Sequence, residues 1–425
     1  MLGDGVITIP YGPQATVSFE VPAGNLLAIL APPAYPPVVD LQAEVRRALA
    51  EPIGAPPLRD LARGRRNAVI IADDNTRLTP TAVIVPELLD EMNAGGLPDA
   101  QITLVIALGT HRAMTDGEIL AKFGPQVVSR IRIVNHDYRD CSNLVDLGAT
   151  PNGTPISINR LVCEADLSIG VGSVYPHHIP GFAGGAKIVQ PGVSGAETTG
   201  ATHLLGTRAR PCYLGQVENP VRQELEAVAR RAGVNVILNT VQNEAGQTVA
   251  AFYGDLQAAF RRAAEVSRAA LSAPFPAPAD IVVAGSFPAD LEFWQAHKAL
   301  YPAELAARPG GTLIIVTPCP EGVSVMHPEM LEYTAWTPVE IEAAIAAGRI
   351  ADIPAAALAI AWSHVRQGRQ VSIVSGGLSD EAARKLGFVP FRSVDAALDD
   401  AFRRLGRDAT VTVLPRAAET LPIPG

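Results

Sequence analysis

The sequence is poor in the residues that mark several large classes of protein. Its 425 residues include only four cysteines, which are widely separated and form no C-x-x-C pair: Cys141, Cys163, Cys212 and Cys319. A disulfide framework or a cysteine-based zinc or iron–sulfur site is therefore not expected. Charged residues make up 18% of the chain, with a net charge of -9 and no Lys/Arg-rich run, so we predict no nucleic-acid partner.

Long apolar runs are also missing. No stretch approaches the roughly 20 apolar residues that cross a bilayer, and the N-terminus lacks a basic segment followed by an apolar core. We therefore predict a cytoplasmic protein without a membrane segment. Hydrophobic residues nevertheless make up 48% of the chain, and its length favours two domains.

Short β-branched runs alternate with helical patterns. The runs lie at 67–74, 101–111, 130–137, 165–174, 235–241, 280–287, 311–318, 370–377 and 410–415, and helical patterns lie at 80–92, 220–233, 256–271 and 354–368. This alternation predicts an α/β protein with largely parallel sheets. The proline- and alanine-rich segment 272–280 is typical of a linker and predicts two α/β domains, 1–273 and 274–425.

Polar residues follow several of these runs, at the strand ends where parallel sheets bind ligands. Asp74 and Arg77 follow the first run, His111 the second, His136 the third and His177 the fourth. We expect one cleft to receive them. A histidine with a pKa near 6.5 can exchange protons at neutral pH, which favours an acid/base role.

A glycine-rich segment and a polar pair add further candidates. Gly184 and Gly185 precede Lys187, an arrangement that brings backbone and one amine close to a ligand; a simple glycine turn with an exposed lysine is the alternative. Gln295 and Lys298 stand three residues apart and share a helix face. That pair suits a carboxylate or hydroxyl group, unless it belongs to a solvated face.

Four motifs, taken in order, resemble the lactate racemase family, whose members use a nickel pincer nucleotide. They are D-x-T-R at 74–77, G-T-H-R at 109–112, P-H-x-x-x-G-F-x-G-G-x-K at 176–187 and Q-A-x-K at 295–298. The resemblance implies a racemase or epimerase that inverts the carbinol carbon of a 2-hydroxy acid, lactate-like or larger, such as a sugar acid. Reversible hydride transfer to the cofactor would carry the reaction.

The same resemblance implies a cofactor site in the N-terminal domain. Lys187 corresponds to the lysine that tethers the cofactor covalently, a pyridinium-3,5-bisthiocarboxylic acid mononucleotide carrying Ni(II), and His203 to the histidine that binds the nickel. Asp74, Gly184 and Gly185 are the other expected cofactor contacts.

It also implies a reaction site in the cleft between the two domains. His111 and His177 correspond to paired acid/base residues on the two faces of the substrate, since each stereoisomer needs its own proton acceptor. Arg77, Gln295 and Lys298 correspond to substrate contacts, the last two from the C-terminal domain. The expected partners are a small 2-hydroxy acid and the proteins that make the cofactor and insert nickel, with a homodimer as the candidate assembly.

Two substitutions separate the chain from the lactate racemase pattern. Ala186 stands where an arginine is found, and Trp294 where a tyrosine is common, so the pocket walls differ and lactate itself is not implied. The tryptophan that lines the family's substrate site corresponds to either Trp336 or Trp362.

Three other classes of function stay open on the residues alone. A zinc hydrolase built on His177, His178 and His203 lacks the usual close ligand pairs, H-x-H or H-E-x-x-H. A nicotinamide-dependent oxidoreductase lacks a glycine-rich turn after the first strand. A non-catalytic relative that binds the cofactor or a hydroxy acid would not need paired acid/base residues.

Overall fold

Two separate sheets organise the chain. The computed structural model describes residues 5–209 and 212–425, which form two compact units. Unit 1 contains Met1–Pro33, Arg210–Leu214 and Leu271–Gly425, and unit 2 contains Ala34–Ala209 and Gly215–Ala270. The largely parallel α/β architecture in two parts confirms the predicted fold class.

Unit 2 is built on a six-stranded sheet with the order β13-β12-β9-β4-β5-β6, in which only β13 is antiparallel to its neighbour. Its strands are β4 (Ala68–Asp73), β5 (Ile102–Ala107), β6 (Arg132–Asn135), β9 (Leu167–Ser173), β12 (Val236–Gln242) and β13 (Thr248–Asp255). The first five confirm the runs predicted as strands, and β13 was not predicted. Every residue of β4, β9 and β12 is buried, as expected for strands covered on both faces.

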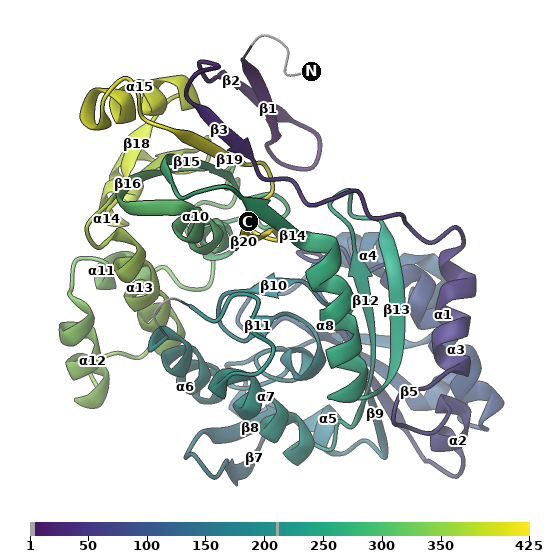
Figure 1. The fold of residues 1–425 in the computed structure, drawn as a ribbon. Helices are drawn as coiled ribbons and strands as arrows, with labels where there is room; N and C mark the ends of the chain where they lie inside the picture. Colours follow the sequence, from purple (N-terminus) through teal and green to yellow (C-terminus); the bar gives the residue numbers. More distant parts are fainter. Residues whose placement is uncertain (1–4, 210–211) are drawn as a thin grey trace. The chain divides into compact units, whose positions relative to one another are not determined.

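Helices cover this sheet and position its loops (Figure 1). They include α1 (Leu41–Ala50), α3 (Thr81–Ala94), α4 (Asp116–Arg130), α7 (Pro220–Arg231) and α8 (Ala258–Leu271). Side chains of α1, α3 and α4 share one hydrophobic cluster with one face of the sheet. A capping box formed by Thr115 and Glu118 starts α4 and brings Lys122 beneath the loop that follows β4.

The strand order of unit 2 creates a switch point between β4 and β9. From β4 the chain continues outward through β5 and β6 on one side, and then returns to β9 and β12 on the other. Loops that leave the carboxyl ends of β4 and β9 therefore diverge, which opens the crevice where such sheets bind ligands. Asp73 ends one of these strands and Ser173 the other.

Unit 1 contains a second six-stranded sheet, all parallel, with the order β18-β17-β16-β15-β19-β3. Its strands are β3 (Leu26–Ile29), β15 (Ala279–Gly285), β16 (Ala307–Val316), β17 (Gln370–Val374), β18 (Val389–Phe391) and β19 (Val411–Leu414). The predicted runs at 280–287, 311–318, 370–377 and 410–415 are confirmed as strands, and the predicted helix at 354–368 is α13 (Ile353–Arg366).

The start of the chain belongs to unit 1 rather than to the N-terminal domain predicted at 1–273. Strand β3 pairs with β19, and the hairpin of β1 (Val6–Pro10) and β2 (Thr16–Glu20) packs on the same hydrophobic cluster as β15 and β16. Such pairing depends on residues far apart in sequence, so local patterns do not reveal it.

The segment predicted as a linker, 272–280, is also more ordered than its composition indicates. Its first residues form β14 (Ser272–Phe275), which pairs in parallel with β20 (Leu421–Pro424). Pro274 is tolerated because this ladder has only two strands, and each strand is an edge. The linker assignment is therefore wrong for 272–275, although unit 1 does resume at Leu271.

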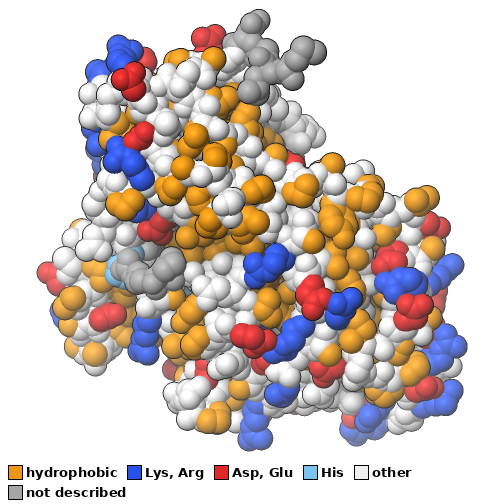
Figure 2. All heavy atoms as spheres, in the orientation of Figure 1, with side chains coloured by type: hydrophobic (Ala, Val, Ile, Leu, Met, Phe, Trp, Pro, Cys, Tyr) orange, Lys and Arg blue, Asp and Glu red, His pale blue; other side chains and the backbone are white. Residues whose placement is uncertain are grey.

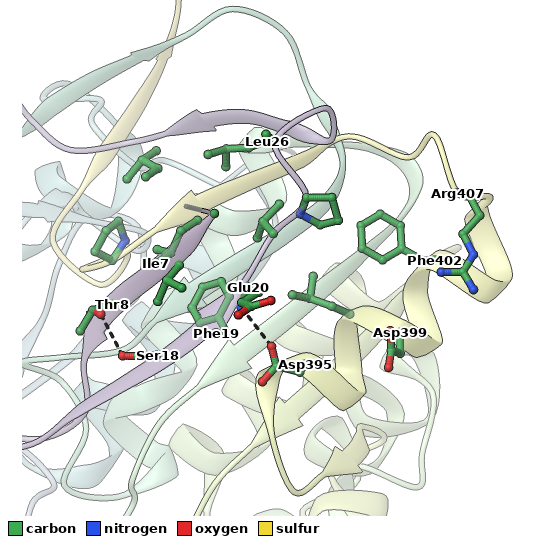
Figure 3. A pocket seen from close by; sticks show the side chains of 18 residues that line it. Ile7, Thr8, Ser18, Phe19, Glu20, Leu26, Asp395, Asp399, Phe402 and Arg407 are labelled. Carbon is green, nitrogen blue, oxygen red and sulfur yellow. Dashed lines mark hydrogen bonds between the residues drawn. The ribbon is translucent and has the colours of Figure 1, made fainter. Parts of the chain in front are cut away.

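A pocket of about 1290 Å³ lies in unit 1 under the β1–β2 hairpin, against α15 (Val394–Leu405) (Figure 3). Apolar side chains such as Phe19 and Phe402 line it, and the backbone N–H of Glu20 donates to Asp395 across its edge at 3.0 Å. None of the predicted site residues lines this pocket, so its size does not identify it as the reaction site.

The surface of unit 2 carries charges of both signs. In the face seen in Figure 2, acidic and basic side chains are interspersed. In the same unit, Arg261 of α8 forms an ion pair with Glu218 at 2.8 Å. Within 5–209 and 212–425, no helix combines the length and apolar character needed to cross a membrane.

Close packing between α2 (Leu58–Ala62) and α3 gives a test of the fold. A Cβ on Gly95 would lie 2.4 Å from the carbonyl oxygen of Arg59, whereas a Cβ on Gly117 in α4 would meet nothing within 4 Å. We expect Gly95→Ala to lower the free energy of unfolding by about 1–3 kcal/mol, and Gly117→Ala to leave it unchanged or raise it by up to about 1 kcal/mol. Urea unfolding measures both; equal free energies would contradict the close contact.

Candidate active site

Asp74 is the first residue after β4, and it is buried against His111. Its Oδ2 atom lies 2.5 Å from His111 Nδ1, and its Oδ1 accepts hydrogen bonds from the backbone and hydroxyl of Thr76. Burial alone would raise the pKa of the Asp74 carboxyl, but the charge and hydrogen bond of His111 and the charge of Arg77 outweigh it and hold the pKa well below its ordinary value. Asp74 is therefore an anion at neutral pH.

His111 follows β5, and its contact with Asp74 determines which ring nitrogen carries the proton. An ionised carboxylate only accepts hydrogen bonds, so the His111 proton lies on Nδ1, facing Asp74. The lone pair of the neutral ring is then on Nε2. An anion behind the ring also stabilises the imidazolium that forms when Nε2 takes up a proton, the same arrangement that supports a general base in other enzymes.

A buried ion pair fixes the loop that carries Asp74 and Arg77. Lys122 of α4 lies 3.2 Å from Asp73 and donates hydrogen bonds to the carbonyl oxygens of Arg77 (2.8 Å) and Thr79 (3.1 Å). Thr79 also donates to Asp73. Arg77 in turn has its guanidinium 5.9 Å from the ring centre of Tyr175, on the loop after β9.

His177 lies beyond β9, in the two-residue strand β10 (Pro176–His177) that pairs with β11 (Gly181–Phe182). Its Nδ1 accepts a hydrogen bond from the backbone N–H of Ile179 at 3.2 Å, so the neutral ring carries its proton on Nε2. His178 stacks on it with ring centres 4.7 Å apart. In the two predicted acid/base residues, Nε2 therefore carries a lone pair in His111 and a proton in His177.

Lys187 lies in the short 3₁₀ helix η3 (Gly185–Ile188), after two glycines with positive φ. Burial, with smaller contributions from the charges of Arg77 and Arg222, lowers the pKa of Lys187 to about 7, although the charge of Asp74 opposes this shift. A large fraction of the amine is therefore neutral at physiological pH, which is the nucleophilic form. Lys187, Arg77 and Asp74 thus share one electrostatic environment.

The backbone at Gly184 and Gly185 is already engaged within unit 2. The Gly185 N–H donates to Asn239 Oδ1 at 2.8 Å, and the Gly184 carbonyl accepts from Arg222. The expectation that Gly184 and Gly185 contact the cofactor thus meets a competing acceptor for the Gly185 N–H. Asn239 is a buried polar residue in the middle of strand β12. An asparagine within an apolar run is the sequence signal by which it could have been recognised as a functional residue.

His203 lies in α6 (Ala196–Thr207), with its Nδ1 2.8 Å from the carbonyl oxygen of Thr199. A carbonyl oxygen only accepts, so Nδ1 carries the proton and Nε2 has the lone pair that a metal requires. In the described part of the chain, no group of three or more His, Cys, Asp or Glu side chains is placed to hold a metal ion. The zinc-hydrolase alternative therefore finds no ligand set there.

His136 was expected in the same cleft but has a structural role. It is buried, with Nε2 3.0 Å from the Ser194 carbonyl and Nδ1 3.1 Å from Asn159 Nδ2. Burial lowers the pKa of His136, so its ring is neutral. It joins the end of β6 to the segment that precedes α6.

Gln295 and Lys298 lie in unit 1, at the end of α9 (Phe293–Ala296) and in the adjoining 3₁₀ turn. Both are buried and Lys298 donates to Gln295 Oε1, which excludes the solvated-face alternative. Trp294 stacks on His327 with ring centres 3.8 Å apart. Whether the pair joins the residues of unit 2 in one site stays a prediction.

The two candidate tryptophans differ in environment. Trp362 is fully buried and packs edge-on against Phe293 of α9 at 5.5 Å between ring centres, whereas Trp336 is 36% exposed. Trp362 therefore lies next to the helix that carries Gln295, and Trp336 contacts Tyr333 instead.

Loss of the Lys122 charge tests the support of the Asp74 loop. Lys122→Met would leave Asp73 as a buried carboxylate without its cation, so we expect the free energy of unfolding to fall by about 3–5 kcal/mol. Arg66→Met is the matched control, because its ion pair with Asp166 is at the surface, and we expect little change. Urea unfolding compares them; equal losses would argue against a structural role for Lys122.

Comparisons with known proteins agree with this architecture. A family model described as the lactate racemase N-terminal domain matches residues 11–211, and one described as the C-terminal domain matches residues 275–420. The lactate racemase of Lactiplantibacillus plantarum is 31% identical over 423 residues, 96% of this chain and 97% of that protein. The lactate racemase of Thermoanaerobacterium thermosaccharolyticum is 35% identical over 323 residues, 74% of this chain and 75% of the relative.

Solved structures give the same result. The apoprotein of the Thermoanaerobacterium thermosaccharolyticum lactate racemase has a TM-score of 0.87 and 28% identity, covering 98% of this chain and all of that one (100%). A Thermotoga maritima protein shares the fold with a TM-score of 0.73 and 19% identity, covering 92% of this chain.

Proposed function

Because the chain belongs to the lactate racemase family and is an isomerase of the racemase class, we propose that it inverts the carbinol carbon of a 2-hydroxy acid by hydride transfer to a nickel pincer nucleotide. The observation that carries this proposal is the Asp74–His111 pair in the same charged environment as Lys187. A covalently attached cofactor that accepts hydride needs an amine for its attachment and a base that removes the hydroxyl proton of the substrate.

The residues present fit such a cofactor. Lys187 supplies an amine with a pKa of about 7 for the covalent tether, and His203 supplies an Nε2 lone pair for nickel. A single protein ligand is sufficient if the remaining donors belong to the nucleotide, as the family resemblance implies, and imidazole suits nickel. When bound, the cofactor would supply the hydride acceptor, which no side chain of the chain can provide.

The protein would then handle the proton. His111 Nε2 takes the hydroxyl proton from one stereoisomer, and the Asp74 anion stabilises the imidazolium that results. His177 presents an N–H at Nε2, and once protonated to the imidazolium it can return the Nε2 proton to the oxygen when the opposite face is reduced. The imidazolium carries a proton on Nδ1 as well, so His177 must release the Ile179 contact in both directions of the reaction.

The substrate would be held by its carboxylate. We assign this role to Arg77 of unit 2 and to Lys298 and Gln295 of unit 1, because a planar cation, an ammonium and an amide can bind a carboxylate and a hydroxyl together. Trp294 stands where a tyrosine is common in the family, and it stacks on His327. We therefore propose a 2-hydroxy acid that is lactate-like or larger, such as a sugar acid, rather than lactate specifically.

Removal of the Asp74 charge tests the acid/base assignment. Asp74→Asn cannot stabilise a charged His111 ring, so we expect turnover per bound nickel to fall by about 10²- to 10⁴-fold. Asp137→Asn, at an exposed aspartate after β6, is the control and should keep wild-type turnover. Wild-type turnover in Asp74→Asn would show that His111 does not act with Asp74.

Cofactor loading tests the proposal as a whole. Protein produced together with cofactor-synthesis and nickel-insertion proteins should carry a nickel-bearing adduct on Lys187 by intact-mass and peptide analysis, and should interconvert stereoisomers of a 2-hydroxy acid or aldonic acid. Lys187→Ala should lose the adduct and His203→Ala the nickel, while the control Lys385→Ala at an exposed lysine keeps both. An unmodified, nickel-free wild-type chain would overturn the proposal.

A further inference from the structure

Arg222 is an arginine with an unusual environment. It is the third residue of α7, is completely buried, and has no carboxylate within ion-pair distance among the described residues. Its guanidinium instead donates to the carbonyl oxygens of Gly184 (3.0 Å) and Phe182. Burial lowers the pKa of Arg222 to about 9, which still leaves it charged at neutral pH. A buried charge of this kind is costly unless other contacts compensate it.

An aromatic ring completes the environment of this arginine. The guanidinium lies 4.0 Å from the ring centre of Phe260 on α8, within the range of a cation–π interaction. The same ring also restricts the loop, because a Cβ on Gly185 would lie 2.8 Å from it. The turn from Phe182 to Gly185 is therefore packed against side chains of α7 and α8, shortly before Lys187.

We propose that Arg222 is the positioning residue for Lys187: its guanidinium clamps the turn that carries this lysine and keeps a positive charge beside the amine. The charged groups that act on the Lys187 amine are Arg77, Arg222 and Asp74. Two cations against one anion favour the neutral amine, which is the form that attacks an acyl carbon. Arg222 would thereby prepare Lys187 for covalent attachment, and this use of the amine rests on the proposed function.

The amine can be tested in the apoprotein, without the cofactor. p-Nitrophenyl acetate acetylates a neutral lysine: a C–N bond forms, the ester C–O bond breaks, and p-nitrophenolate and a proton are released. Labelling from pH 5.5 to 10, mapped by peptide mass spectrometry, should give Lys187 a midpoint near 7 in the wild type. A midpoint at the ordinary lysine value, about 10.4, would overturn the proposal without any variant.

Variants of Arg222 then distinguish the effect of its charge from the effect of its hydrogen bonds to the turn. Arg222→Gln removes the cation, and a one-unit rise in the Lys187 pKa would reduce its acetylation at pH 7 about five-fold. Arg230→Gln, on an exposed position of α7, removes the same charge from the same helix and should leave the profile unchanged. A wild-type profile in Arg222→Gln would overturn the assignment.

Arg222→Lys keeps the charge but loses the planar guanidinium whose two nitrogens donate to the two carbonyl oxygens. We expect its labelling midpoint to stay near the wild-type value, while hydrogen exchange in the peptide 181–188 becomes faster, because the Phe182 and Gly184 carbonyls lose their partner. Exchange as slow as in the wild type would overturn the clamp. A normal labelling profile together with failed cofactor loading would instead refute the proposed function and leave the role of Arg222 intact.

Discussion

Two adjacent buried carboxylates at the end of β4 are the constraint on which the candidate site depends. Asp73 is the last residue of β4 and Asp74 is the first residue after it, and their side chains contact different partners. Asp73 contacts Lys122, which fixes the loop, and Asp74 contacts His111, which orients a ring. A carboxylate left without a partner in this position would be strongly destabilising. Asp73 and Asp74 thus link the conformation of the loop after β4 to the protonation of His111.

Much of this arrangement could be predicted because it depends on local patterns. Apolar runs indicated the strands, and the parallel sheet then brought the residues at their carboxyl ends to one edge, which is why Asp74 and His111 were expected to meet. The roles of Lys187 and His203 came from the resemblance to a family, not from spacing. Their environments, an amine with a lowered pKa and a ring with its lone pair on Nε2, are compatible with those roles.

The supporting residues could not be predicted because their contacts are distant in sequence. Arg222 contacts carbonyls almost forty residues before it, and Lys122 contacts a loop more than forty residues before it. Neither belongs to a motif, and both lie on helices whose patterns indicate only an apolar face. The wrong linker at 272–275 has the same origin, since its strand partner is the C-terminal β20.

The pairing of β3 with β19 has a consequence for the newly made chain. On the ribosome, β3 emerges roughly 380 residues before its partner, so at 5–20 residues per second its edge waits about 20–80 s for completion. Unit 2 is encoded almost entirely between these two strands and can close its own sheet in the meantime. Unit 2 would therefore be complete before the sheet of unit 1 has its last strand, and early termination would leave β3 without its partner.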